Sequence, residues 1–207
     1  MSNLKQYKYT ISSNNGILSS EQRNFFEDNG YIVIRCLIDE TLLDQFKKRF
    51  IDICENKVNR GGITVMKDIS LVKRNQEEIP NERIVNKIQD IVWDDVFEQY
   101  FLHPELLDHV QCFTGNNIMA MHSMLINKPP DTGSMTSRHP MHQETRKAIS
   151  CHFASCECRY IDVTGTTQQN IAIEVKEIAR RRGFNDMDFK DFWKFRSRLV
   201  RGLKMHL

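Results

Sequence analysis

The sequence has no apolar run that approaches the roughly 20 residues a membrane-spanning helix needs, so we expect no membrane span. Glycine and proline are scarce, nine and five in 207 residues, which excludes collagen-like and low-complexity chains. Charge of one sign is not in excess, because the formal net charge is only +2, and this favours no class of partner. No apolar run follows the start from Met1 to Lys5, so we expect no signal peptide.

What is present is the composition of a globular protein, with 40% hydrophobic and 27% charged residues. At this length we expect one domain over residues 18–207, preceded by a loose polar arm over residues 1–17. The sequence has six cysteines. Because we expect no secretion signal, we predict that these cysteines are reduced thiols of an intracellular protein and not a disulfide framework.

Basic residues gather near the C-terminus, where residues 176–207 hold ten Lys or Arg against four Asp or Glu. Such a segment can attract phosphates, either those of nucleic acid or those of a CoA thioester. We interpret it as a solvated helix face and expect no nucleic-acid interface.

The apolar periodicity predicts an α+β protein. Expected strands cover residues 31–34, 63–66, 118–126 and 148–154. Expected helices cover residues 20–29, 39–53, 103–114 and 166–182, with one or two helices over residues 82–101 and a last helix from residue 188. Ser19 and Gln22 have the spacing of a capping box, and Asp39 is the expected N-cap of the second helix. The strands are few for the helical faces that a sheet must bury, which indicates that part of a sheet is missing.

The densest group of candidate metal ligands runs from Ser137 to Glu144, with the letters S-R-H-P-M-H-Q-E. His142 and Glu144 have the H-x-E spacing, and in an extended strand residues two apart point to the same side. An imidazole and a carboxylate would then converge on one point. This is two thirds of the 2-His-1-carboxylate set that binds Fe(II) and leaves positions open.

Longer motifs resemble the phytanoyl-CoA hydroxylase (phytanoyl-CoA dioxygenase) family. They are N-I-M-A-M-H-S-M-L-I-N-K-P-P-D from Asn117, S-R-H-P-M-H-Q from Ser137, R-K-A-I-S-C-H-F-A-S from Arg146 and Y-I-D-V-T-G-T from Tyr160. The resemblance covers the chain from about residue 18 onward. It implies a double-stranded β-helix of the jelly-roll or cupin kind, with flanking helices.

The resemblance also implies a site. His142 falls on the first metal ligand, and Glu144 stands where the family has the aspartate ligand, as a weak substitute. Lys87, Met124 and Arg146 fall on contacts to 2-oxoglutarate. An arginine suits that role because its guanidinium can pair with a carboxylate through two hydrogen bonds. The implied cofactors are Fe(II) and 2-oxoglutarate, with ascorbate as an accessory reductant.

The family reaction is 2-hydroxylation of a branched fatty acyl-CoA in peroxisomal fatty-acid α-oxidation, with succinate and carbon dioxide as co-products. The resemblance therefore implies an acyl-CoA substrate and a peroxisomal location. The C-terminal residues from Met205 to Leu207 are not the S-K-L peroxisomal address, and we expect no targeting signal in this sequence.

The sequence departs from the family between Gln143 and Arg146. Where the family has a long segment with several strands and the second histidine ligand, only Glu144 and Thr145 stand here. The pattern is that of an internal deletion that removes part of the barrel. We therefore expect this chain to be impaired as an oxygenase, because one histidine and one glutamate leave too few ligands for iron.

Two other classes of function stay open. One is a non-catalytic variant that binds an acyl-CoA or a protein partner with what remains of the family fold. The other is a small metal- or nucleic-acid-binding module built on the basic tail and on four soft ligands, Cys151, His152, Cys156 and Cys158. Their spacing is not a standard zinc pattern, and neighbouring residues of a strand point to opposite faces, so we expect ordinary cysteines.

Overall fold

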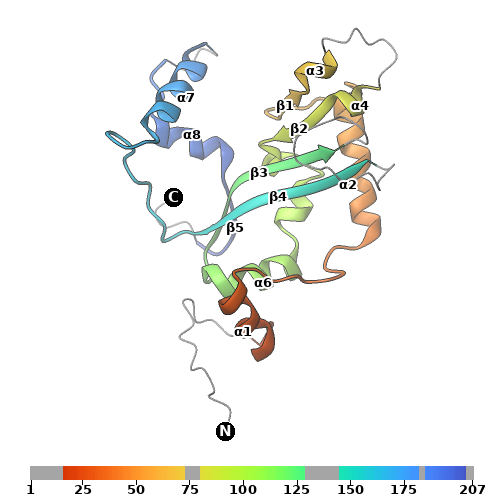
Figure 1. The fold of residues 1–207 in the computed structure, drawn as a ribbon, viewed down its shortest axis with the longest axis vertical. Helices are drawn as coiled ribbons and strands as arrows, with labels where there is room; N and C mark the ends of the chain where they lie inside the picture. The colour runs from red at the N-terminus through yellow and green to blue at the C-terminus, as the bar shows by residue number, and fades with distance from the viewer. Residues whose placement is uncertain (1–15, 73–79, 129–144, 182–184, 204–207) are drawn as a thin grey trace.

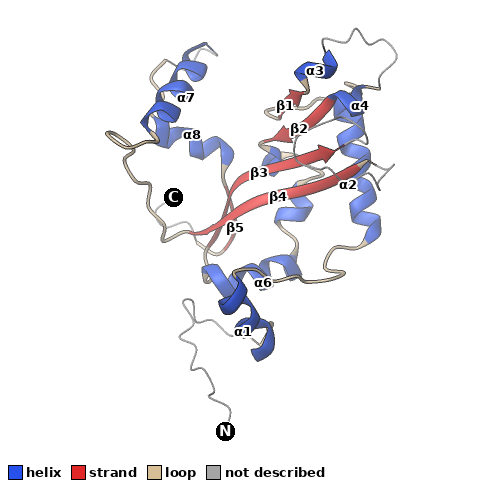
Figure 2. Cartoon of the chain, viewed as in Figure 1, coloured by secondary structure: helices blue, strands red, loops and turns tan. Residues whose placement is uncertain are grey.

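The computed structural model describes residues 16–72, 80–128, 145–181 and 185–203. These residues form one antiparallel sheet with helices around it (Figures 1 and 2). The strands are β1 (Thr64–Lys67), β2 (Val85–Gln89), β3 (Ile118–Lys128), β4 (Arg146–Ser155) and β5 (Arg198–Arg201). Their order is β1-β2-β3-β4, and β5 pairs with the first residues of β3, so β3 is the central strand.

The helices are mostly short. They are α1 (Ser20–Asn29), α2 (Glu40–Cys54), α3 (Ile69–Val72), α4 (Asn81–Ile84), η1 (Ile91–Trp93), α5 (Glu98–Phe101), α6 (Pro104–Thr114), α7 (Gln169–Arg181) and α8 (Phe189–Arg196). The capping box of Ser19 and Gln22 is present at α1, and the Asp39 carboxylate accepts a hydrogen bond from the Leu42 N–H at 2.9 Å. Both predicted caps are confirmed. No helix in the described part of the chain is long and apolar enough to span a membrane.

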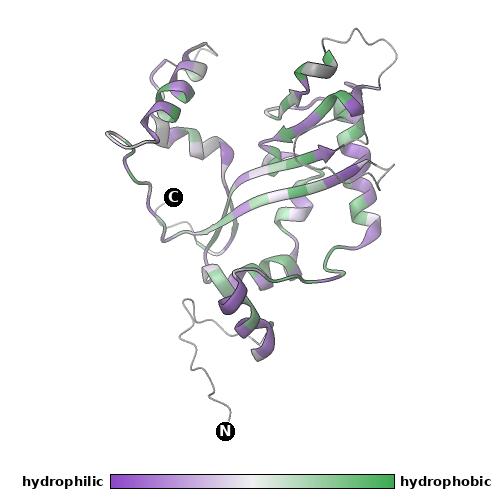
Figure 3. Cartoon of the chain, in the orientation of Figure 1, coloured by the Kyte–Doolittle hydropathy of each residue, from purple (hydrophilic) through white to green (hydrophobic). Residues whose placement is uncertain are grey.

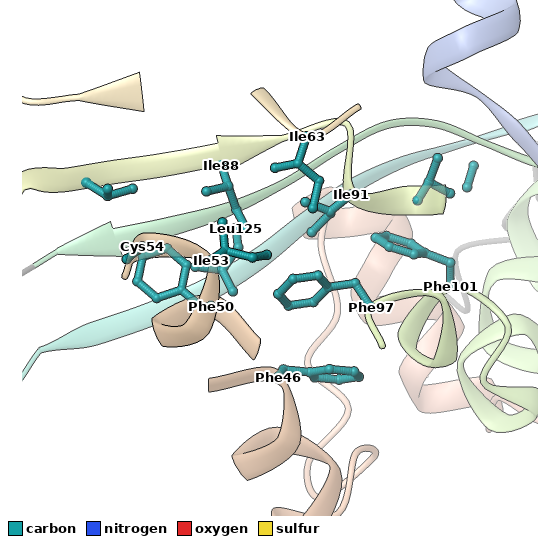
Figure 4. Close-up of a cluster of buried hydrophobic side chains, with 13 residues drawn as sticks. Phe46, Phe50, Ile53, Cys54, Ile63, Ile88, Ile91, Phe97, Phe101 and Leu125 are labelled. Carbon is teal, nitrogen blue, oxygen red and sulfur yellow. The ribbon is translucent and has the colours of Figure 1, made fainter. Parts of the chain in front are cut away.

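The hydrophobic core lies between α2 and one face of the sheet. Phe46, Phe50 and Ile53 of α2 are at most 2% exposed and belong to one buried cluster with residues of β2 and β3, shown in Figure 4. The aromatic rings of Phe46 and Phe97 stack with centroids 5.8 Å apart. The hydropathy colouring of Figure 3 shows apolar residues along β3 and mainly polar residues along α1. Burial against α2 thus fixes which face of the sheet is covered.

Two arginines form hydrogen-bonded ion pairs between the C-terminal elements and the rest of the fold. Arg196 of α8 donates to the Asp90 carboxylate at 2.6 Å, and Arg201 of β5 donates to the Asp108 carboxylate of α6 at 2.6 Å. Asp90 has a left-handed backbone (φ 64°), which aspartate tolerates better than most residues, and it ends β2. The basic residues near the C-terminus therefore include structural cross-links as well as a solvated helix face.

Two predicted elements are wrong. Residues 31–34 form no strand, and Tyr31 and Val33 are more than half exposed. Residues 82–101 contain only short helices, α4, η1 and α5, and the strand β2 (Val85–Gln89) interrupts the predicted helical segment. Ile84, Ile88 and Ile91 have helical spacing, but pairing of β2 with β1 and β3 satisfies its backbone and overrides the local pattern.

The α+β class is confirmed, as are the strands predicted near residues 63–66, 118–126 and 148–154. A double-stranded β-helix consists of two facing sheets, whereas the strands of the described residues form a single sheet of five. The truncated β-helix, the loose arm over residues 1–17 and the single domain over residues 18–207 stay predictions.

Candidate functional site

The sheet has a second face, opposite the α2 core, and we call it the site face. Residues alternate between the two faces of a strand. On β3, the buried Ser123, Leu125 and Asn127 point to the core, so the residues between them point to the site face. The site face is formed by Lys87, Gln89, His122, Met124, Ile126, Lys128, Arg146, Ala148, Ser150 and His152.

Three residues with an implied role in 2-oxoglutarate binding lie on this face. Lys87 pairs in register with Ile126, Met124 pairs with Ser150, and Arg146 pairs with Lys128. Lys87, Met124 and Arg146 therefore belong to three adjacent strands and to neighbouring rows of side chains. The sequence separates them by up to 59 positions, from 87 to 146, and the register of β3 with both its neighbours brings them together.

Two neighbouring cations of β4 differ sharply in their partners. Lys147 points to the core, where its ammonium pairs with Glu82 and lies 5.4 Å from the centroid of the Phe50 ring. Arg146 points to the site face, is exposed, and has no ion-pair partner among the described residues. Lys87 on β2 is half-buried, points to the site face, and also has no ion-pair partner among the described residues. The site face thus offers three cations, Lys87, Lys128 and Arg146, that have no ion-pair partner among the described residues and could attract an anionic ligand.

The two predicted metal ligands, His142 and Glu144, lie outside the described residues, so their placement is not tested. Within the described ranges, no group of three or more His, Cys, Asp or Glu side chains is placed to hold a metal ion. The described residues therefore fit an anionic co-substrate, but they do not supply an iron site by themselves.

A histidine pair on the site face was not predicted. His122 and His152 lie opposite each other on β3 and β4, with ring centroids 5.7 Å apart and an interplanar angle of 68°. The His122 Nε2 atom is buried and finds no hydrogen-bond partner in the described part of the chain. Burial is the main cause that lowers the pKa of His122 below its usual 6.5, so a neutral ring lies beside Met124. The sequence feature that could have revealed this pair is the two-residue spacing of His122 and Met124, which places both side chains on one face of β3.

The four soft ligands near residue 151 do not converge. Cys151 points toward the core, and burial raises the pKa of its thiol to about 12. His152 lies on the site face, Cys156 is fully buried after the end of β4, and Cys158 is exposed. A buried, protonated thiol is a poor metal ligand. The predicted orientation of Cys151 and His152 to opposite faces is confirmed.

Comparison with known proteins gives a consistent result. The family model described as "Phytanoyl-CoA dioxygenase (PhyH)" matches residues 26–155. The chain is 35% identical to the mouse protein "Phytanoyl-CoA dioxygenase, peroxisomal" over 98% of this chain and 88% of that protein. It is 33% identical to the human protein of that name over the same shares. It is also 33% identical to the Caenorhabditis elegans "Probable phytanoyl-CoA dioxygenase" over 92% of this chain and 96% of that protein.

The length of these alignments carries further information. The alignment with the mouse protein runs over 301 positions, whereas this chain has 207 residues. At least 94 aligned positions of the mouse protein, the difference between the two lengths, therefore have no counterpart here. Because the alignment still spans nearly all of this chain, the unmatched positions lie inside it rather than beyond its ends.

Proposed function

We propose, from the premise that this chain belongs to the phytanoyl-CoA dioxygenase family, that it is a variant of an Fe(II)- and 2-oxoglutarate-dependent dioxygenase of branched fatty acyl-CoA. In this proposal the chain keeps the co-substrate-binding face and lacks part of the metal site. It binds 2-oxoglutarate and an acyl-CoA, and its turnover is impaired.

The observation that carries this proposal is the placement of Lys87, Met124 and Arg146 on one face of the sheet. 2-Oxoglutarate has two carboxylates, and Lys87 and Arg146 have no carboxylate partner among the described residues. Arg146 is suited to the distal carboxylate because a guanidinium can donate two parallel hydrogen bonds. Lys87 would add a second positive charge two strands away, and Met124 an apolar surface between them.

The metal site supports the impaired form of the proposal. His142 and Glu144 would be the protein ligands to iron, which would supply the oxidation of the acyl-CoA together with 2-oxoglutarate and oxygen. The second histidine of the family belongs to the segment that we place between Gln143 and Arg146. At least 94 positions of the mouse relative without a counterpart here support such a deletion.

The substrate and the location follow from the relatives. The mouse and human relatives carry "phytanoyl-CoA" and "peroxisomal" in their names, so we propose a branched fatty acyl-CoA as ligand and the peroxisome as the location of this chain. A non-catalytic acyl-CoA-binding variant remains the second candidate. It would use the same placement of Lys87, Met124 and Arg146 on one face of the sheet to bind its ligand.

The test is binding of 2-oxoglutarate to the purified chain by calorimetry, with and without Fe(II) under anaerobic conditions, followed by oxygen and phytanoyl-CoA. We expect 2-oxoglutarate binding that Arg146→Gln weakens at least tenfold and that the matched surface variant Arg35→Gln leaves unchanged. We expect succinate release far below one equivalent. Stoichiometric succinate would show an active enzyme, and no binding of 2-oxoglutarate by a folded chain would refute the proposed site.

A further inference from the structure

The site face carries a pair of histidines that the proposed function does not use. His122 on β3 and His152 on β4 stand directly opposite each other in the register of these two strands. Directly opposed residues of an antiparallel pair have Cβ atoms about 4.5–5.5 Å apart, on the same side of the sheet. The pairing of β3 with β4 extends to both ends of β4, from Arg146 to Ser155, so the backbone holds the two imidazoles next to each other.

The two rings are close enough for one metal ion to bind both. Their centroids lie 5.7 Å apart, with an interplanar angle of 68°. A bond between zinc and an imidazole nitrogen is about 2.0–2.1 Å long, so two imidazoles on one ion have centroids roughly 5–6 Å apart. The rings of His122 and His152 therefore need little movement to share an ion.

One nitrogen of this pair lacks a partner. The Nε2 atom of His122 is buried and has no hydrogen-bond partner among the described residues. Buried polar atoms of folded proteins are nearly always paired, and an unpaired one can mark the place of a water molecule or an ion. His152 is exposed, so an ion can approach the pair from the side of this residue. An ion between the rings would give the His122 nitrogen a partner.

The charges around His122 permit a bound cation but weaken its binding. The ring is acted on by the charges of Arg196, Asp90 and Lys87. Arg196 pairs with Asp90 at 2.6 Å, so these two charges largely cancel. Lys87 has no ion-pair partner among the described residues, and its ammonium repels a cation. Burial holds the pKa of His122 below 6.5, which leaves the ring neutral near pH 7, and metal ions bind the neutral ring.

The ligand type indicates the class of ion. Imidazole nitrogens suit divalent transition-metal ions such as zinc, nickel and copper, whereas magnesium and calcium bind oxygen ligands. Among the residues that the structure describes, no third His, Cys, Asp or Glu joins the pair, so water or a small ligand would fill the other positions. The pair also shares no residue with the ligands implied by the family resemblance, His142 and Glu144.

We propose that His122 and His152 form a two-histidine site for a divalent transition-metal ion. The ion links the central strand β3 to β4, the outermost strand of the described sheet, and so stabilises the pairing of these strands. This site does not depend on the proposed dioxygenase function.

The test is a zinc titration of the full chain without 2-oxoglutarate, in which ¹⁵N-labelled histidine side chains are followed by nuclear magnetic resonance. Zinc is the probe because it is not redox-active. We expect the ring nitrogens of His122 and His152 to shift together with one apparent Kd, because both bind the same ion. Signals of individual histidines separate this site from zinc bound by cysteines elsewhere.

Two variants give a matched pair. His152→Gln removes one ligand at an exposed position, and we expect it to raise the Kd read from His122 at least tenfold. His109→Gln on α6 removes a histidine outside the pair and should leave this Kd unchanged. We expect zinc to raise the melting temperature of the original chain and not that of His152→Gln, because an ion that binds the folded state stabilises it.

Lys87→Gln separates this proposal from the proposed function. Loss of the repelling charge should lower the zinc Kd about two- to fivefold, whereas the same change should weaken 2-oxoglutarate binding. Zinc binding by the histidine pair without any 2-oxoglutarate binding would support the metal site while the proposed function fails.

Three results would overturn the metal site. The first is a His122 signal that does not move at millimolar zinc. The second is a zinc Kd that His152→Gln leaves unchanged. The third is loss of the zinc-dependent shifts in His142→Gln, which would assign the ion to the ligands implied by the family. The joint shift in the original chain tests the site even if His152→Gln does not fold.

Discussion

At the scale of single residues, Arg146 and Lys147 show how strand alternation gives two adjacent basic residues different surroundings. Both are basic and adjacent, and strand alternation sends them to opposite faces. Lys147 is only 13% exposed and compensates the charge of Glu82 at the edge of the core. The guanidinium of Arg146 has no ion-pair partner among the described residues, so we expect it to add little to the stability of the folded state.

We expect Lys147→Gln to lower the free energy of unfolding by about 1–3 kcal/mol, because it removes a partly buried charge-assisted contact and leaves Glu82 unpaired. Arg146→Gln is the matched control, and we expect it to change the same quantity by less than about 0.5 kcal/mol. Urea unfolding followed by circular dichroism measures both. A larger loss of stability from Arg146→Gln than from Lys147→Gln would mean that Arg146, and not Lys147, makes the stabilising contact.

His122 supplies a pH dependence of stability. Burial lowers the pKa of His122 below 6.5, and Arg196 adds to this effect. His152 and Lys87 lower it further, while Asp90 opposes them. The unfolded chain therefore takes up a proton at His122 before the folded chain does as the pH falls. Its contribution to stability is complete above the unfolded pKa, declines as the pH falls through 6.5, and levels off below the folded pKa.

We expect the melting temperature to fall between about pH 7.5 and pH 5.5, and to fall less in His122→Gln than in the original chain. This window lies above the range in which most carboxylates titrate. The comparison variant is His109→Gln on α6, which should keep the slope of the original chain. Thermal melts at four or five pH values suffice. An unchanged slope in His122→Gln would assign the pH dependence to other groups.

At the scale of elements, the C-terminal segment is joined to the rest of the protein by the pairing of β5 with β3, by packing of Val200 against the core and by side-chain contacts. Arg198 at the start of β5 donates to the Glu98 carboxylate at 2.5 Å and to the Val92 carbonyl at 3.2 Å. Its guanidinium also lies 5.0 Å from the centroid of the Trp93 ring. Together with the backbone pairing of β5 with β3, these contacts hold β5 and the preceding helix α8 next to the sheet.

Arg198→Gln removes this set of contacts at once. We expect a loss of about 1–3 kcal/mol in the free energy of unfolding, which at this chain length corresponds to a melting temperature lower by roughly 3–10 °C. Arg159→Gln, an exposed arginine without an ion pair among the described residues, is the control and should change neither. Differential scanning calorimetry of both variants checks the prediction. Equal melting temperatures would show that β5 is held by its backbone pairing alone.

How far the sequence predicts the elements depends on whether local signals or long-range pairing decide them. The long apolar β3 and the caps at Ser19 and Asp39 are visible locally, because a run of apolar residues or a capping side chain acts over a few positions. β2 was predicted as part of a helix, and β5 was not predicted, because strands of five and four residues carry too little periodicity. Their conformation is set by partners far along the chain.

The candidate site was predictable for a different reason. Lys87, Met124 and Arg146 were assigned from motifs of a family, and nothing in their own spacing indicates that they share a face. The register of the sheet supplies that information, and it requires the topology. His122 could have been found by its two-residue spacing from Met124, which places both side chains on one face of β3.

At the scale of the whole molecule, β4 is the outermost strand of the sheet formed by the described residues, and it is ten residues long. Long unpaired edges of this kind promote association between chains, and proteins usually protect them. We proposed that the family segment missing between Gln143 and Arg146 supplies further strands and the second histidine. The same absence would then leave both the edge of β4 unprotected and the metal site incomplete.

Restoring that segment should therefore repair both properties together. In a chimera, the unmatched residues of the mouse relative, which we propose belong between Gln143 and Arg146, replace Glu144 and Thr145. We expect stoichiometric Fe(II) binding, succinate release on addition of phytanoyl-CoA that exceeds that of the original chain at least a hundredfold, and a monomer in sedimentation velocity. A complete 2-His-1-carboxylate set and a covered sheet edge are the physical reasons.

The control is an insert of the same length made of glycine and serine, which restores chain length without strands or ligands. It should neither bind iron nor protect the edge of β4. A folded chimera that releases no succinate would show that the missing segment is not the cause of the impaired turnover. The cause would then lie in other residues, for example in Lys87 or Arg146. Equal succinate release from chimera and original chain would refute the impaired-variant proposal, because the missing segment would then be dispensable for the reaction.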